Sequence, residues 1–147
     1  MFYVEAPERE FPVNKRSIFL AGTITGTSNW QKDITDSLSN MDIVVLNPRR
    51  KIPESIKDSY EQIQWEFDML RHASIISFWF APETVGPITL YELGAHSMTS
   101  KPLLLGVDPK YQRIKDIQVQ TKLVRPEIDI VYSLPDLINK ILEEFSI

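Results

Sequence analysis

Ile75-Ile76-Ser77-Phe78-Trp79-Phe80 is the most apolar run in this sequence of 147 residues. A strand that is apolar on both faces is typical of a parallel sheet covered by helices on both sides, so this run predicts the central strand of such a sheet. Shorter apolar runs predict four further buried strands. They are Ser17–Ala21 and residues 43–46, 102–107 and 128–132.

Helical patterns alternate with these runs. They predict a helix that begins after Ser28 or Asn29, a helix over about residues 59–72, a helix that contains Glu92 and a C-terminal helix capped by Ser133. Strands that alternate with helices indicate a parallel sheet with right-handed crossovers. We therefore predict an α/β fold, a flavodoxin-like or Rossmann-like three-layer sandwich with a five-stranded, mainly parallel sheet.

Parts of this pattern are less regular. In the second predicted helix, Ile63, Phe67 and Leu70 have the spacing of a core stripe. Residues 1–14 contain breakers and no sustained period, so we expect an irregular N-terminal arm. Residues 111–125 are polar, and the pattern assigns them neither an element nor a role in the core.

Composition limits the classes of function. With 147 residues and 43% hydrophobic content, we expect one domain over residues 1–147. The sequence has no cysteine and only two histidines, so we expect no metal site and no cofactor. A net charge of −4 without a basic stripe argues against a nucleic-acid polymer as partner. No apolar run has the length of a membrane span, and we expect a soluble cytoplasmic protein without a membrane partner.

Three loops follow predicted strands and mark the expected ligand site. In open parallel sheets, ligands bind outside the carboxyl ends of the strands. These ends correspond here to residues 22–28, 47–50 and 81–87. In the first loop, Gly22 and Thr23 allow backbone and hydroxyl groups to approach a sugar or phosphate, although the loop matches no known phosphate-binding pattern.

Glu92 lies in an otherwise apolar helix start, directly after the third of these loops. A carboxylate removed from water without a partner is costly, so such groups are usually paired, neutralised or functional. Two readings of Glu92 follow from the residues alone. It is either a partly exposed helix residue favoured by the helix dipole or a catalytic carboxylate.

Several short motifs occur in a specific order between residues 17 and 107. They are Ile18-Phe19-Leu20-Ala21-Gly22, Trp30, Asn47-Pro48-Arg49-Arg50, Gln64-Trp65-Glu66, Asp68-Met69-Leu70 and Tyr91-Glu92-Leu93-Gly94. The set resembles the nucleoside 2-deoxyribosyltransferase superfamily. The Asn-Pro-Arg-Arg and Trp-Glu elements resemble the branch called nucleoside 2-deoxyribosyltransferase-like.

This resemblance implies an enzyme that transfers a 2-deoxyribosyl group between nucleobases through a covalent sugar bound to a glutamate. The nucleophile corresponds to Glu92, and the second acid corresponds to Asp68. Apolar neighbours such as Phe67 are expected to raise the pKa of Asp68 and keep it protonated, as the acid that protonates the departing base must be. Asp68 as a buried structural carboxylate is the alternative.

Two positions depart from the pattern of this superfamily. Phe19 stands where a tyrosine orients the nucleophile, so Tyr91, Trp65 or a threonine of the first loop would have to replace that hydroxyl or N–H group. Gly86 stands where a sugar-binding aspartate is expected.

Other residues complete the predicted binding set. Glu83 or Thr84 can compensate for the aspartate that is missing at position 86. Trp30 and Trp65 are candidates to line a nucleobase pocket, although tryptophans at such positions are more often core.

The Asn47-Pro48-Arg49-Arg50 motif carries a further alternative. Asn47 and Arg49 are candidate binding residues, and an arginine at a strand end suits a 5′-phosphate. A solvated turn, or an ion pair with Glu54, is the structural alternative for the two arginines. Phosphate binding by Arg49 would favour a deoxynucleotide as the substrate.

Three functions therefore remain open. They are a deoxyribosyltransferase, a deoxynucleoside or deoxynucleotide N-glycosidase, and a non-catalytic nucleotide-binding module. The expected partners are a small nucleoside or nucleotide and a free nucleobase. The resemblance also implies a homo-oligomer whose sites are completed by a neighbouring subunit, with residues 111–125 as the candidate crossing segment.

Overall fold

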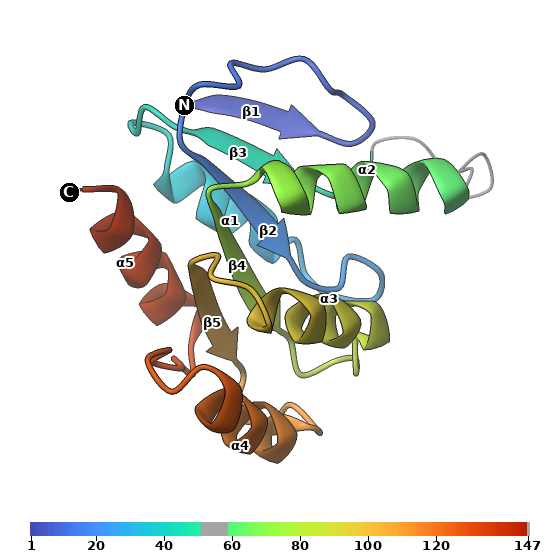
Figure 1. Cartoon of the computed structure of the whole chain (residues 1–147), viewed down its shortest axis with the longest axis vertical. Helices are drawn as coiled ribbons and strands as arrows, with labels where there is room; N and C mark the ends of the chain where they lie inside the picture. The colour runs from blue at the N-terminus through green and yellow to red at the C-terminus, as the bar shows by residue number, and fades with distance from the viewer. Residues whose placement is uncertain (51–58, 147) are drawn as a thin grey trace.

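The computed structural model describes residues 1–50 and 59–146, and its sheet is entirely parallel in this part of the chain (Figure 1). The strands are β1 (Phe2–Glu5), β2 (Ser17–Ala21), β3 (Val44–Asn47), β4 (Ile75–Phe80) and β5 (Leu103–Val107). They lie in the order β1-β3-β2-β4-β5. The chain runs from β2 to β3 on one side and then returns past β2 to β4. The direction of the connections therefore reverses between β2 and β4.

The central strands form where the sequence predicts them. Every residue of β2 and β4 is buried, and the pairing runs from Ile18 beside Ile75 to Ala21 beside Phe78. The reason is the run of large apolar side chains, which only a sheet covered on both faces can bury. The predicted three-layer α/β fold of the flavodoxin type is confirmed.

The fifth strand is not where we expected it. Around residues 128–132 the chain makes only an isolated bridge, between Val131 and Gly106. Instead β1 occupies the opposite edge of the sheet beside β3, so the N-terminal arm begins with a strand. An edge strand needs little burial, and within β1 only Val4 is buried, which explains why its apolar pattern is weak.

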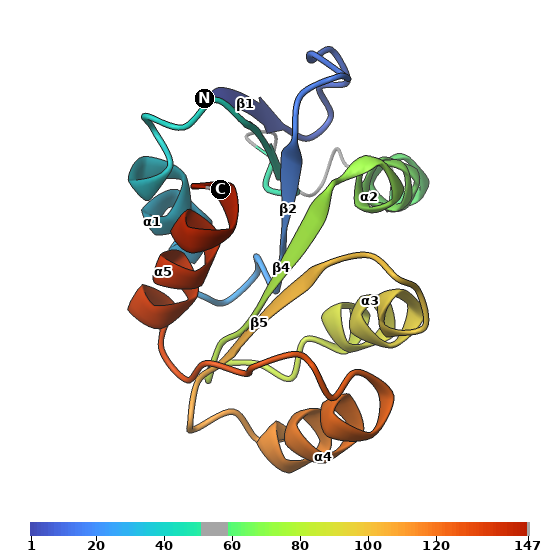
Figure 2. The same cartoon turned by 60° about the vertical axis from the view of Figure 1, so that its left-hand side comes forward.

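In residues 1–50 and 59–146, five helices cover the two faces of the sheet. They are α1 (Trp30–Ser37), α2 (Ser59–His72), α3 (Pro87–Ser97), α4 (Ile114–Val124) and α5 (Leu134–Phe145). Figure 2 shows α1 and α5 on one side of the sheet and α2, α3 and α4 on the other. One hydrophobic cluster lies on each side, with Trp30 and Ile141 in one and Trp65 and Phe78 in the other.

Two of the predicted helix caps are confirmed. The Asn29 side chain accepts a hydrogen bond from the backbone N–H of Lys32 at 3.3 Å, and the Ser133 hydroxyl accepts one from Asp136 at 3.2 Å. Such bonds satisfy N–H groups that the first turn of a helix leaves without a partner. They set the starts of α1 and α5.

The predicted core stripe of α2 is wrong in two of three positions. Ile63 and Phe67 are 64% and 53% exposed, whereas Leu70 is buried as expected. Helix α2 instead packs through the face that contains Trp65 and Met69. That face also includes polar residues, which a reading of hydrophobic spacing assigns to the surface.

The polar segment over residues 111–125 does have a role in the core. It contains α4, and Tyr111 and Ile117 are 2% and 3% exposed within the cluster on the α2 side.

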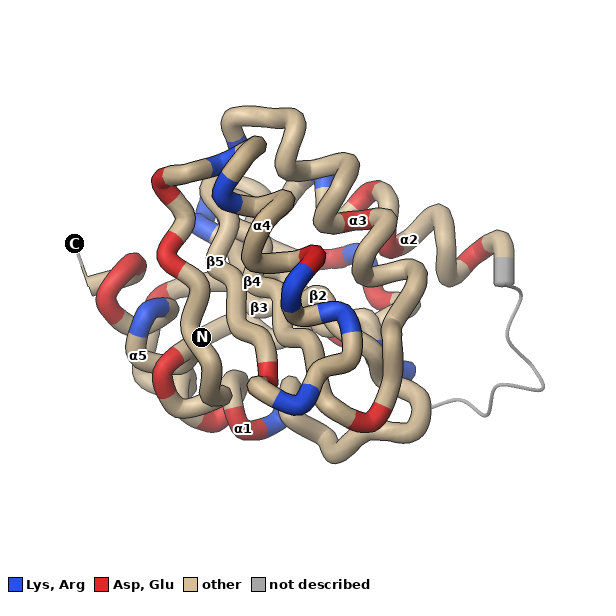
Figure 3. Tube along the Cα trace, turned by 90° about the horizontal axis from the view of Figure 1, so that it is seen from below, with Lys and Arg blue, Asp and Glu red and all other residues tan. Residues whose placement is uncertain are grey.

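None of the helices in the described part of the chain is long and apolar enough to cross a membrane. Figure 3 shows basic and acidic residues interspersed over the described chain.

Candidate active site

A cleft of about 220 Å³ opens at the carboxyl ends of β2 and β4, where the connections change direction. Open parallel sheets bind their ligands at this position. Two loops, the turn after β3, and helices α2 and α3 form its walls. The described lining residues are Phe19, Gly22, Thr23, Ile24, Thr25, Pro48, Glu66, Thr84, Gly86, Pro87, Ile88, Thr89 and Glu92.

The loop after β2 is held by side chains behind it. The indole N–H of Trp30 donates to the Thr23 carbonyl at 3.1 Å, and the Thr27 hydroxyl donates to the same oxygen at 3.0 Å. Gly22 allows the indole to approach, because a Cβ there would lie 2.4 Å from the Trp30 ring. The loop therefore follows one path, with Thr23 in the cleft wall.

Gly86 joins the second loop to α3. Its φ of 58° is in the left-handed region, and a Cβ at this position would meet the Thr23 hydroxyl at 2.5 Å. An aspartate at position 86 would therefore be strained and would clash with the first loop. Thr84 and Thr89 lie in the lining beside it and present hydroxyl groups.

Among the described residues, two carboxyl groups face this cleft, and their charges interact. Glu92 comes from α3 and Glu66 from α2. Burial, and then the negative charge of Glu66, raise the pKa of Glu92 to about 8. Glu92 is therefore mostly protonated at neutral pH, because a buried carboxyl group beside a like charge holds its proton more tightly.

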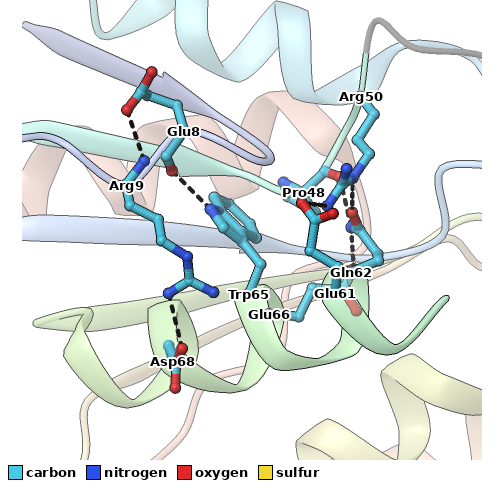
Figure 4. A network of polar contacts seen from close by, with 9 residues as sticks. All are labelled: Glu8, Arg9, Pro48, Arg50, Glu61, Gln62, Trp65, Glu66 and Asp68. Atoms are coloured by element: carbon cyan, nitrogen blue, oxygen red, sulfur yellow. Dashed lines mark hydrogen bonds and ion pairs between the residues drawn. The ribbon is translucent and has the colours of Figure 1, made fainter. Parts of the chain in front are cut away.

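Glu66 is the cleft carboxyl group that the sequence reading missed. Gln62 orients it by donating from its amide nitrogen to one carboxylate oxygen at 3.0 Å, and the same nitrogen donates to the Pro48 carbonyl (Figure 4). The sequence feature that could have identified Glu66 is the Gln64-Trp65-Glu66 motif. Glu66 is adjacent to Trp65, which is fully buried, so it lies near the inward face of α2.

Asp68 lies outside the cleft lining and is paired elsewhere. Its carboxylate accepts hydrogen bonds from Arg9 at 2.8 Å and from Gln64 at 3.1 Å (Figure 4). These bonds lower the pKa of Asp68, so the expected rise in its pKa is wrong. The expected apolar surroundings are absent because Phe67 points outward with 53% of its surface exposed.

The two tryptophans proposed for a nucleobase pocket are core residues. Trp65 is fully buried and donates from its indole nitrogen to the Glu8 carbonyl at 2.7 Å. Trp30 is 1% exposed and supports the first loop from behind. Neither is in the described lining, whereas Phe19 is.

The Asn-Pro-Arg-Arg motif makes bonds within the protein. Asn47 is buried. Its side-chain amide donates to the Tyr3 hydroxyl at 2.9 Å, and its side-chain oxygen accepts a hydrogen bond from the backbone N–H of Arg49 at 3.0 Å. Arg50 contacts Gln62 and pairs with Glu61 at 3.1 Å. The arginine side chain is 4% exposed, so it is not a solvated turn residue. Glu54, the alternative partner, lies outside the described residues.

Arg49 likewise donates hydrogen bonds to protein groups, which are the side chain of Gln31 and the carbonyls of Ile24 and Ser28. Glu83 and Tyr91 are exposed and are not in the described lining. Tyr91 is 79% exposed, so it does not supply the hydroxyl that Phe19 lacks in this chain. Of the suggested replacements, Thr23, Thr25 and Thr84 line the cleft.

Comparison with known proteins gives a family match and a fold match. The model of the family described as "Nucleoside 2-deoxyribosyltransferase like" matches residues 15–111. No curated protein matches the sequence. Among solved structures, a conserved protein from Enterococcus faecalis V583 is similar, with a TM-score of 0.60 and 13% identity over 88% of this chain and 99% of that chain. At this identity the likeness shows the fold alone.

Proposed function

We propose that this chain, which belongs to the nucleoside 2-deoxyribosyltransferase-like family, transfers a 2-deoxyribosyl group from one nucleobase to another. The observation that carries the proposal is the pair of interacting carboxyl groups, Glu92 and Glu66, in the cleft at the strand ends. Two neighbouring carboxyl groups, one of which holds a proton, supply a nucleophile and an acid, which is what cleavage of a glycosidic bond requires.

In the first half of the proposed reaction, a carboxylate oxygen of Glu92 bonds to the anomeric carbon while the bond from that carbon to the base nitrogen breaks. Glu66 gives its proton to the departing base. Glu92 must be ionised for this step, so its proton first moves to Glu66 as the substrate binds. The positive charge that develops at the anomeric carbon favours an ionised Glu92 and a protonated Glu66, because this charge stabilises the carboxylate next to it.

In the second half, a nitrogen of the incoming base attacks the anomeric carbon. Its proton passes to Glu66, and Glu92 leaves as a carboxylate. Water in place of the second base would give hydrolysis by the same steps. The hydroxyl groups of Thr23, Thr84 and Thr89 are the proposed contacts to the sugar, since Gly86 has no side chain to offer.

Assay of the full chain with deoxynucleosides, with and without a second free base, tests the proposal. Exchanged nucleoside in the chromatogram supports transfer, free deoxyribose supports an N-glycosidase, and binding without turnover supports a non-catalytic module. Mass spectrometry of the quenched reaction should find one deoxyribosyl group on the peptide that contains Glu92. Turnover that survives Glu92→Ala would exclude the covalent mechanism.

The choice of acid is tested separately. Glu66→Gln should lower turnover by about 10²-fold or more, as loss of a positioned general acid does. Asp68→Asn is the matched control, because Asp68 is bound by Arg9 outside the cleft lining. A larger loss in Asp68→Asn than in Glu66→Gln would return the role to the residue expected from the sequence.

We also propose that the chain forms a homo-oligomer through α2 and α3, which lie on the same side of the sheet (Figures 1 and 2). Their outward faces carry large exposed apolar side chains, which we call the α2–α3 apolar face. These are Tyr60, Ile63, Phe67, Ile88 and Tyr91. Ile88 also lines the cleft, so a partner on this face would reach the mouth of the site.

A further inference from the structure

Arg49 makes three hydrogen bonds to one short stretch of chain. Its Nε donates to the side-chain oxygen of Gln31 at 2.8 Å, and its two terminal nitrogens donate to the carbonyls of Ile24 at 3.2 Å and Ser28 at 2.8 Å. The acceptors lie in the loop after β2 and in the first turn of α1. Arg49 itself is not in the described lining of the cleft.

This loop depends on side chains for its shape. Residues 22–29 form neither helix nor strand, and Gly26 turns the chain with a φ of 74°. The side-chain hydrogen bonds that its carbonyls accept from outside the loop come, in the described chain, from Trp30 at Thr23 and from Arg49 at Ile24 and Ser28. A planar guanidinium is suited to holding several acceptors in a fixed arrangement.

Gln31 fixes the direction of the guanidinium in turn. Its side chain is fully buried at the start of α1, and its oxygen accepts from Arg49. The first loop then contributes Gly22, Thr23, Ile24 and Thr25 to the cleft wall, with the Thr23 hydroxyl against Gly86. A line of contacts therefore runs from Gln31 through Arg49 and the loop to the second wall of the cleft.

We infer that Arg49 is a positioning residue, which holds the loop after β2 in the shape that forms the substrate cleft, and is not a ligand for a 5′-phosphate. The inference rests on the proposed function for its kinetic test. It assigns a role to the Asn-Pro-Arg-Arg motif that is different from the phosphate binding considered from the sequence. Three of the five guanidinium N–H groups already donate to Gln31, Ile24 and Ser28, and these bonds fix the guanidinium on the loop.

Arg49→Met tests this inference, because methionine keeps much of the side-chain length and removes every donor. Turnover is measured with a deoxynucleoside and with its 5′-monophosphate, and amide hydrogen exchange is followed in the same variant. We expect turnover of both substrates to fall by the same factor, about 10²-fold, as small displacements of a site produce. Amides of residues 22–29 should exchange faster, while those of β2 and β4 stay protected.

Two further variants serve as controls. Arg113→Gln removes an exposed arginine on a turn that does not line the cleft, and it should change neither turnover nor exchange in residues 22–29. Arg49→Lys keeps the positive charge with fewer donors. It should fall between wild type and Arg49→Met in both measurements, which keeps the inference testable if the methionine variant does not fold.

Other results of these measurements would contradict the positioning role of Arg49. A selective loss of monophosphate turnover would make Arg49 a phosphate ligand, and unchanged turnover with either substrate would remove the positioning role. Faster exchange throughout the sheet in both variants would show a general loss of stability and would overturn the inference. If the wild type turns over no substrate, the proposed function fails, and exchange in residues 22–29 then decides alone whether Arg49 holds the loop.

Discussion

At the scale of single residues, Glu92 is unusual because its carboxyl group is protonated near neutral pH. Burial and the charge of Glu66 raise the pKa of Glu92 from 4.5 to about 8. Between these two values the folded protein keeps a proton that the unfolded chain has lost. Stability is therefore highest at or below about pH 4.5 with respect to this group, and it falls as the pH rises to about 8.

Glu92→Gln should remove this dependence, because glutamine is neutral throughout. We expect the variant to be inactive and to unfold at a higher temperature than wild type at pH 8, with the difference shrinking toward pH 4.5. Thermal unfolding at several pH values measures it. A variant that is less stable than wild type at pH 8 would show that the carboxyl of Glu92 is not disfavoured by its site.

The influence of Glu66 on Glu92 can be measured directly. In Glu66→Gln the repulsive charge is gone, so the pKa of Glu92 should fall below about 8 yet stay above 4.5, because burial is the larger cause of the shift. Carbon-13 NMR of labelled glutamate carboxyl groups follows the titration. Asp68→Asn should leave the pKa of Glu92 where it is, and an equal effect of both variants would contradict the pairing.

The pH dependence of turnover should reflect the same pair. In the proposed mechanism the proton that Glu92 holds in the free enzyme becomes the acid for the departing base, so kcat/KM is expected to fall as the pH rises through about 8, where this proton is lost. Initial rates at low substrate concentration, between pH 6 and 9, measure this limb. A kcat/KM that keeps rising above pH 8 would indicate that only the ionised nucleophile matters.

At the scale of elements, the glycine that caps α3 and the glycine within α3 have opposite expectations. Gly86 precedes the helix at a φ of 58° with the Thr23 hydroxyl against it, whereas Gly94 lies within the helix and a Cβ there would meet nothing within 4 Å. The first glycine is required by its backbone and its neighbour. The second only lowers the helix propensity of its segment.

Gly86→Ala should therefore destabilise the protein by about 1–3 kcal/mol, and Gly94→Ala should stabilise it by about 0.5–1 kcal/mol. Urea unfolding at fixed pH gives both values. The Thr23→Ala background provides the control, because it removes the oxygen that the new Cβ would meet at 2.5 Å. An equal cost of Gly86→Ala in both backgrounds would mean that the positive φ alone accounts for it.

At the scale of the whole molecule, the α2–α3 apolar face is large enough to hold a second copy. Its five side chains are between 53% and 79% exposed, which corresponds to roughly 600 Å² when large side chains present about 200 Å² each. A standard interface buries about 800 Å² on each partner, of which about 65% is apolar in homodimers. The face supplies that apolar part.

Ile63→Glu should weaken self-association, because it puts a charge on this apolar face, where Ile63 is 64% exposed. Leu123→Glu is the matched control, since Leu123 is 78% exposed on α4 and outside the face. Sedimentation equilibrium of the wild type and both variants gives the mass in solution. A monomeric wild type, or an equal effect of the two variants, would contradict assembly through α2 and α3.

The amino-acid sequence alone determined strands β2 to β5, the helix caps and Glu92 as a candidate. Long apolar strands and capped helices are specified by neighbours along the chain, so patterns with a period of two or 3.6 residues report them. The edge strand β1 and the outward side of α2 were misassigned, because both depend on what packs against them.

Only the tertiary structure decided which polar groups meet at the strand ends. In the folded chain Glu66 lies close enough to Glu92 to raise its pKa, Asp68 pairs with Arg9, and Arg49 donates to the first loop. These partners are far apart along the chain, and Asp68 and Glu66 differ by two positions on the same helix. A rotation of about 200° about the helix axis separates such neighbours, so the packing of α2, and not its composition, selected the carboxyl that faces the cleft.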